Sequence, residues 1–214
     1  MADVRIDDKI LTEKGLNTGA AEAKTLLLAC GALAREILAV IEANGWTHLA
    51  LHCLPAILHN SPQGIPDAVE AAVLEHRPNY DEIFVVYADC GTGGQLQQRC
   101  EDLGVKMMAG PHCYAFFDGV ETFEAREEFT AFYLTDFLVR QFDAFVWKPL
   151  GLDRYPDLLE TYFGNYTKLV HLAQTDDPAL TEKASVCAAR LGLEFEHRAT
   201  GYGELTPELA RIRP

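Results

Sequence analysis

Two segments of the chain show the same features in the same order: an apolar run, a Cys-Gly pair, a helical stretch, a glycine, a second apolar run and a cysteine. The cysteines are Cys30 and Cys53 in residues 25–53, and Cys90 and Cys113 in residues 82–113, and each pair is 23 positions apart. Alternating strands and helices of this kind give parallel strands joined by right-handed crossovers. The repeat therefore predicts an α/β fold with helices on both faces of a parallel sheet.

Apolar periodicity and glycine stops define the elements of these two units. The expected strands are residues 25–31, 47–53, 82–88 and 105–109, and the expected helices are residues 32–43, 66–76 and 95–103. A third and weaker copy lies near residues 168–200, with strands at 168–173 and 193–197 and a helix at 178–191. Gln174-Thr175 and Thr200 stand there in place of the cysteines.

The remaining segments complete the expected organisation. A helical stretch at residues 121–142 and a segment at residues 155–166 separate the second and third units. Residues 1–24 lie before the first apolar run and are expected to form an N-terminal arm or an edge element. The sequence thus predicts one α/β domain over residues 25–214, preceded by this arm.

Charge and hydropathy narrow the class of partner. The net charge is −14, and no basic stripe interrupts it, so approach to nucleic acid or to an anionic membrane is opposed by Coulomb repulsion. The polar N-terminus lacks the apolar core of a signal peptide, and no apolar run approaches the length of a membrane span. We therefore expect a cytoplasmic protein with a small-molecule substrate and with neither nucleic acid nor membrane as a partner.

The cysteines carry the strongest functional signal. Disulfides are rare in a reducing cytosol, and four of the six cysteines fall at carboxyl ends of predicted parallel strands, where ligands bind in such sheets. Cys30, Cys90 and Cys113 are the preferred metal ligands, with Cys53 as the natural fourth. Three thiolates from separate loops can hold a 4Fe-4S cluster with one open iron, which we favour, or zinc with an open position.

Other roles for these cysteines stay open. Buried cysteine is common in cores, and a cysteine at a helix N-terminus can also serve as a nucleophile or a redox group. Cys100 and Cys187 lie within helical stretches and are expected to pack in the core. His59 and His112 lie in loops at strand ends, which makes them the candidates for acid–base catalysis, and His112 could also be a ligand.

A glycine-rich turn suggests a further binding site. Gly91, Thr92, Gly93 and Gly94 precede a helix, and backbone N–H groups in such a turn can cradle an anionic group of a substrate. The G-x-G-x-x-G spacing of dinucleotide sites and the lysine of the P-loop are both absent. The turn therefore predicts an anion site without identifying the anion.

Aromatic residues are dense between positions 129 and 145. At helical spacing they favour a core or a homodimer interface over a cofactor site. These residues are Phe132, Tyr133, Phe137, Phe142 and Phe145.

Several short motifs together resemble a microbial family, the domain of unknown function sixteen-thirty-eight. The motifs are Leu28-Ala29-Cys30-Gly31, Leu58-His59-Asn60, Tyr87-Ala88-Asp89-Cys90-Gly91, His112-Cys113-Tyr114, Phe132-Tyr133-Leu134-Thr135-Asp136, Gly151-Leu152-Asp153-Arg154, Tyr162-Phe163-Gly164-Asn165-Tyr166 and Thr200-Gly201-Tyr202-Gly203. The resemblance covers most of the chain from Thr25 onward. It implies a setting in one-carbon or anaerobic metabolism, because some members are encoded near corrinoid-dependent methyltransferases, but it names no reaction.

Three functional hypotheses follow. The first is a metalloenzyme whose cysteine-bound cluster or zinc acts on a small metabolite, with His59 and His112 moving protons. The second is a metal- or corrinoid-binding accessory protein that serves a methyltransferase without turnover of its own. The third is a metal-free domain in which the cysteines pack and the glycine-rich turn binds an anion.

Overall fold

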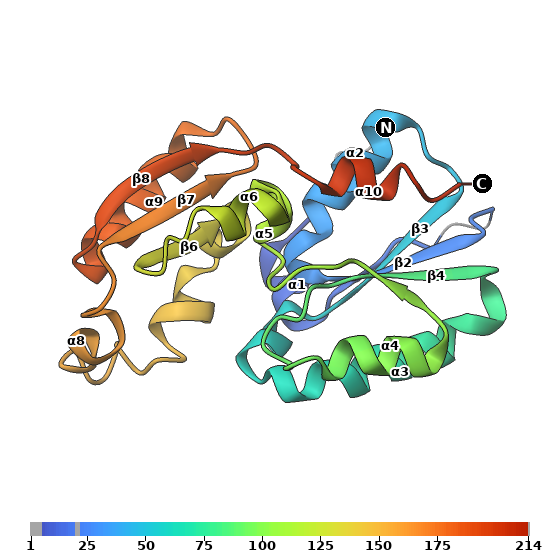
Figure 1. The fold of residues 1–214 in the computed structure, drawn as a ribbon, viewed down its shortest axis with the longest axis horizontal. Helices are drawn as coiled ribbons and strands as arrows, with labels where there is room; N and C mark the ends of the chain where they lie inside the picture. Colours follow the sequence, from blue (N-terminus) through green and yellow to red (C-terminus); the bar gives the residue numbers. More distant parts are fainter. Residues whose placement is uncertain (1–5, 20–21, 214) are drawn as a thin grey trace. The chain divides into compact units, whose positions relative to one another are not determined.

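The computed structural model describes residues 6–19 and 22–213, which form two compact units, each built on its own sheet (Figure 1). Unit 1 is the described part of Met1–Cys113 together with residues 205–213, and unit 2 is Tyr114–Glu204. The first two predicted repeats lie in unit 1, and the third lies in unit 2. The predicted α/β class is confirmed, and each unit carries parallel strands with helices.

Unit 1 holds a five-stranded sheet in the order β1-β3-β2-β4-β5. Its strands are β1 (Leu16–Asn17), β2 (Thr25–Cys30), β3 (Leu49–Leu54), β4 (Glu82–Val86) and β5 (Lys106–Met107). All neighbours are parallel except β1, which pairs antiparallel with β3. Every residue of β2 is buried, as its unbroken apolar run predicts for a central strand covered on both faces. The described part of the predicted N-terminal arm thus supplies an edge strand.

The helices of unit 1 cover both faces of this sheet. The longer ones are α2 (Ala34–Asn44), α3 (Ile65–His76) and α4 (Gln95–Leu103), and the shorter ones are α1 (Asp8–Glu13), η1 (Gly31–Leu33), η2 (Ala56–Asn60), η3 (Pro62–Gly64), η4 (Arg77–Asn79) and α10 (Leu205–Leu209). Gly45 and Gly104 end α2 and α4 in the left-handed conformation, with φ of 63° and 65°. The predicted helices and their glycine stops are confirmed.

The strand order of unit 1 reverses at β2. The chain runs from β2 to β3 on one side and then returns to β4 on the other side of β2. As a result α2 lies on one face of the sheet, while α3 and α4 lie on the opposite face (Figure 1). In sheets of this kind, ligands bind outside the carboxyl ends of the strands at the point of reversal. Here that point lies beyond Cys30 and Val86, where β2 and β4 end.

Unit 2 holds a three-stranded parallel sheet, β6 (Ala131–Thr135), β7 (Lys168–Ala173) and β8 (Glu194–Ala199). One face packs against α9 (Pro178–Leu191), and the other packs against Tyr114 and Phe123. The remaining elements are α5 (Ala115–Asp118), α6 (Val120–Ala125), α7 (Asp136–Arg140), η5 (Asp143–Trp147) and α8 (Leu158–Phe163).

The helix predicted over residues 121–142 is wrong. A strand, β6, separates α6 from α7, because its aromatic and apolar residues suit a pleated surface buried on both sides. Phe132 packs against one core cluster and Tyr133 belongs to the other, so the two side chains lie on opposite faces of the strand. Thr135 then starts α7 by accepting a hydrogen bond from the backbone N–H of Leu138.

A buried polar network lies at the carboxyl end of the unit 2 sheet. The Asp136 carboxylate accepts hydrogen bonds from Nε2 of His171 at 2.9 Å and from Oγ1 of Thr175 at 2.6 Å. It also accepts one from the backbone N–H of Thr175 at 3.0 Å, while the Asp136 N–H donates to Gln174 at 2.7 Å. Asp136 and His171 are each 1% exposed, so water cannot replace these bonds.

In the described part of the chain, helices are either too short or too polar to cross a lipid bilayer.

Candidate metal centre

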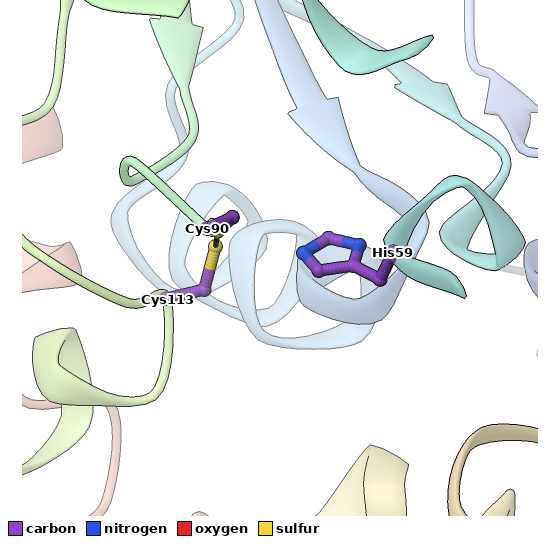
Figure 2. A group of neighbouring side chains, drawn as sticks. All are labelled: His59, Cys90 and Cys113. Carbon is purple, nitrogen blue, oxygen red and sulfur yellow. Dashed lines mark hydrogen bonds between the residues drawn. The ribbon is translucent and has the colours of Figure 1, made fainter. Parts of the chain in front are cut away.

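Three side chains that can bind a metal gather at the carboxyl edge of the unit 1 sheet. They are His59, Cys90 and Cys113, and their ligand atoms all lie within 4.8 Å of one another (Figure 2). His59 lies in η2 just after β3, Cys90 follows β4, and Cys113 follows β5. Three segments that follow strands β3, β4 and β5 at one sheet edge therefore supply one ligand each, beside the point where the strand order reverses.

Backbone hydrogen bonds between two loops bring the cysteines together. The N–H of Asp89 donates to the carbonyl of Gly110 at 3.0 Å, and the N–H of Cys90 donates to the carbonyl of Pro111 at 3.1 Å. The loop after β4 is thereby fixed against the loop after β5. The Sγ atoms of Cys90 and Cys113 consequently lie 3.1 Å apart.

The turn that carries Cys90 is strained and stabilised from within. Cys90 has a φ of 50°, a conformation that side chains other than glycine rarely adopt and that clusters at functional sites. The Asp89 carboxylate accepts hydrogen bonds from the N–H of Gly93 at 3.2 Å and of Gly94 at 2.6 Å, and from Oγ1 of Thr92 at 2.9 Å. The turn thus holds Cys90 in position.

These bonds bear on the anion site predicted at Gly91, Thr92, Gly93 and Gly94. The amides of Gly93 and Gly94 already donate to a carboxylate of the chain itself. Anion binding at this turn stays a prediction, and it requires Asp89 to release both amides.

The orientation of His59 decides which of its nitrogens can bind a metal. Its Nδ1 lies 3.3 Å from the carbonyl oxygen of Ala56 and 3.6 Å from Sγ of Cys30. In Figure 2 the opposite edge of the ring, which carries Nε2, is turned toward Cys90 and Cys113. A proton on Nδ1 that is donated to Ala56 leaves the lone pair of Nε2 free, as in most histidine–metal sites.

The three groups strongly affect one another's protonation in the metal-free protein. The hydrogen bond with Cys113 lowers the pKa of Cys90 well below its usual value, and His59 adds to this against the opposing effect of burial. The same bond, together with burial, raises the pKa of Cys113. Burial lowers the pKa of His59, but the neighbouring Cys30 and Cys90 sulfurs outweigh it and raise that pKa. The site therefore concentrates negative charge on the Cys90 sulfur.

The other predicted ligands lie outside this group. Cys30 contacts His59 on its Nδ1 side and accepts a hydrogen bond from the N–H of Ala32 at 3.3 Å. Cys53 is buried within β3, where burial raises the pKa of its thiol. His112 is half-buried in the loop next to Cys113. Cys30, Cys53 and His112 are not among the residues whose ligand atoms gather within 4.8 Å.

The sequence pattern predicts proton transfer for His59 and, outside the family motif, predicts no role for Tyr87. The pattern that points to His59 as a ligand is its place just after the carboxyl end of a strand, because Cys90 and Cys113 also follow strands of this sheet. Tyr87 lies within the strand expected at residues 82–88 and directly follows the observed β4. Its ring lies parallel to the His59 ring, at an interplanar angle of 9° and a centroid distance of 6.3 Å.

The short distance between Cys90 and Cys113 predicts a selective oxidation. Their sulfurs, 3.1 Å apart, need to approach by about 1 Å to reach a disulfide bond length. Hydrogen peroxide acting on the metal-free protein is expected to join them, because the two thiols release two protons and two electrons that reduce the peroxide to water. Peptide mass spectrometry should recover the Cys90–Cys113 cross-link, whereas in Cys113→Ala the Cys90 sulfur should stop at sulfenic acid. A different cross-link as the main product contradicts this geometry.

Comparison with known proteins gives a family match. A family model described as "Protein of unknown function (DUF1638)" matches residues 53–209, a span that contains His59, Cys90 and Cys113 and begins after Cys30. No curated protein and no solved structure matches the chain.

Proposed function

Since the chain belongs to the DUF1638 family, whose description names no activity, we propose its function from the site itself. The proposal is that the protein is a metalloenzyme that binds one zinc ion through His59, Cys90 and Cys113 and leaves a fourth coordination position for a small-molecule substrate. The observation that carries it is the convergence of three ligand atoms within 4.8 Å.

The spacing of the ligand atoms supports a single ion. Two thiolates bound to one zinc at about 2.3 Å each stand roughly 3.8 Å apart in tetrahedral geometry. The Cys90 and Cys113 sulfurs lie 3.1 Å apart, so they need to move only slightly farther from each other to bind the same ion. In a 4Fe-4S cluster each thiolate binds a different iron, which places the sulfurs farther apart. We therefore propose zinc in place of the cluster that the sequence favoured.

The number and type of ligands support an open site. Structural zinc sites have four protein ligands, whereas catalytic sites have three and keep one position for water or substrate. Among the residues that the structure describes, no fourth Cys, His, Asp or Glu joins His59, Cys90 and Cys113. Cys30 lies on the Nδ1 side of the imidazole, and one ring cannot direct both of its nitrogens to the same ion.

The residues of the chain have separable roles in this proposal. Bound zinc supplies a Lewis acid that polarises a coordinated oxygen. Ala56 and Cys30 fix the orientation of His59 through its Nδ1, and Asp89 holds the turn that presents Cys90. The buried setting of Cys90, which is 9% exposed, limits the access of water to the site.

Metal and sulfide analysis of the protein purified without oxygen tests the proposal. We expect a colourless protein with about one zinc per chain and no acid-labile sulfide. A brown protein whose iron is matched by sulfide would replace zinc with a cluster. A protein that takes up no metal after loading with zinc would rule out both and leave the metal-free alternative.

A further inference from the structure

The Tyr87 hydroxyl is buried without a hydrogen-bond partner. Tyr87 is 0% exposed, and among the described residues nothing pairs with its hydroxyl. Buried tyrosine hydroxyls usually have a hydrogen-bond partner, because an unpaired one has lost its hydrogen bonds to water and gained none within the protein. A buried hydroxyl of this kind is therefore available to donate to a ligand or an ordered water from outside the chain.

The surroundings of Tyr87 place it beside the candidate metal centre. Tyr87 lies three residues before Cys90, and its ring is parallel to that of His59. The pairing of β2 with β4 ends at Ala29 and Val86, so Tyr87 is the first residue beyond β4, while Cys30 ends β2 in its pairing with Leu54 of β3. Burial and the nearby Cys30, Cys113, Cys53 and Cys90 sulfurs raise the pKa of the phenol, which keeps it a neutral hydrogen-bond donor.

We propose that the open metal position takes an oxygen ligand, a carboxylate, carbonyl or hydroxide oxygen, that accepts a hydrogen bond from the Tyr87 hydroxyl. This inference rests on the proposed function and adds the class of ligand to it. A cation on one side and a fixed donor on the other stabilise negative charge on an oxygen in a site that excludes water. The sulfurs of the site cannot take this role in the structure, since none of them pairs with the hydroxyl.

Two small ligands distinguish a direct hydrogen bond from Tyr87 from a general effect of Tyr87 on the shape of the site. Acetate presents a free oxygen next to the one that binds the metal, and it can accept the bond from Tyr87. Imidazole binds through one nitrogen and offers only an N–H donor elsewhere, so it gains nothing from the phenol. Cobalt replaces zinc as the probe metal, because its visible ligand-field bands report each ligand as it binds.

The experiment titrates the cobalt protein with acetate and with imidazole in wild type, Tyr87→Phe and Tyr133→Phe. Loss of a hydrogen bond to a charged group corresponds to a ten- to hundred-fold effect. We expect Tyr87→Phe to lower the affinity for acetate by about that factor and to change the affinity for imidazole by less than about twofold. Tyr133→Phe, which removes a hydroxyl bonded to Glu128 in unit 2, should bind both ligands as wild type does.

Each other outcome contradicts the inference in its own way. Unchanged acetate binding in Tyr87→Phe shows that the hydroxyl does not face the ligand. An equal loss of acetate and imidazole shows that Tyr87 only shapes the site. A wild-type protein that binds no cobalt overturns the proposed function, and this inference falls with it. The melting temperature of metal-free Tyr87→Phe should equal or exceed that of wild type, because the substitution removes an unpaired buried group.

Discussion

Cys90→Ala, Cys113→Ala and His59→Ala are each expected to leave the protein without bound metal after dialysis against a weak chelator. Each substitution removes one of only three ligands, so the remaining two cannot hold the ion. Loss of an outer-shell partner already weakens metal binding by 10–100-fold, and loss of a ligand should exceed about 100-fold. Competition against a chromophoric chelator measures the affinity of each variant directly.

Cys30→Ala and Cys100→Ala are the matched controls for these variants. The Cys30 sulfur contacts Nδ1 of His59, so its removal should weaken zinc binding by about tenfold and retain the metal. Cys100 is buried in α4 away from the ligand group and should have no effect on metal content. If Cys30→Ala empties the site as fully as Cys90→Ala does, Cys30 is a ligand and the site has no open position.

Asp136→Ala is expected to destabilise unit 2 by about 3 kcal/mol or more, because each buried donor left without an acceptor costs about 1–3 kcal/mol. The substitution leaves His171 and the Thr175 N–H and hydroxyl without their acceptor in a region closed to water. Hydrogen exchange of the β7 amides in the intact chain reports the stability of this unit separately. Asp153→Ala, which removes an exposed carboxylate, should change it by less than about 0.5 kcal/mol.

The effect of Asp136→Ala should also depend on pH. Burial raises the pKa of Asp136, but hydrogen bonds from His171 and Thr175 outweigh it and hold that pKa below its usual value. A carboxyl group whose pKa is lowered in the folded state stabilises the fold at pH values above its pKa in the unfolded chain, which is about 4. This contribution is lost as the pH falls further. The difference between wild type and Asp136→Ala should therefore shrink on acidification below pH 4. A difference that stays constant contradicts the charged role of Asp136.

The strands and helices of unit 1 could be predicted because their signals are local. An unbroken apolar run identified β2, and glycine at the required left-handed position identified the ends of α2 and α4. The error at β6 has a physical cause. The aromatic residues on either side of Thr135 lie at spacings that also fit a helix, and only the packing of Phe132 and Tyr133 into separate core clusters shows that this segment is a strand.

The site could be predicted in part. Cys90 and Cys113 follow from the rule that ligands gather at the carboxyl ends of parallel strands, and the structure does bring them together. The role of Cys30 does not follow from that rule, because it depends on which nitrogen of His59 faces the sulfurs. That orientation is set by the carbonyl of Ala56, three residues before His59, and no pattern in the sequence reveals it.

X-ray absorption at the zinc edge of the loaded protein tests the central claim, a three-ligand centre with an open position. The account predicts two sulfur neighbours at about 2.3 Å and lighter neighbours, nitrogen and oxygen, at about 2.0–2.1 Å. A shell of three or four sulfurs would show that Cys30 or Cys53 completes a closed site and would contradict the account.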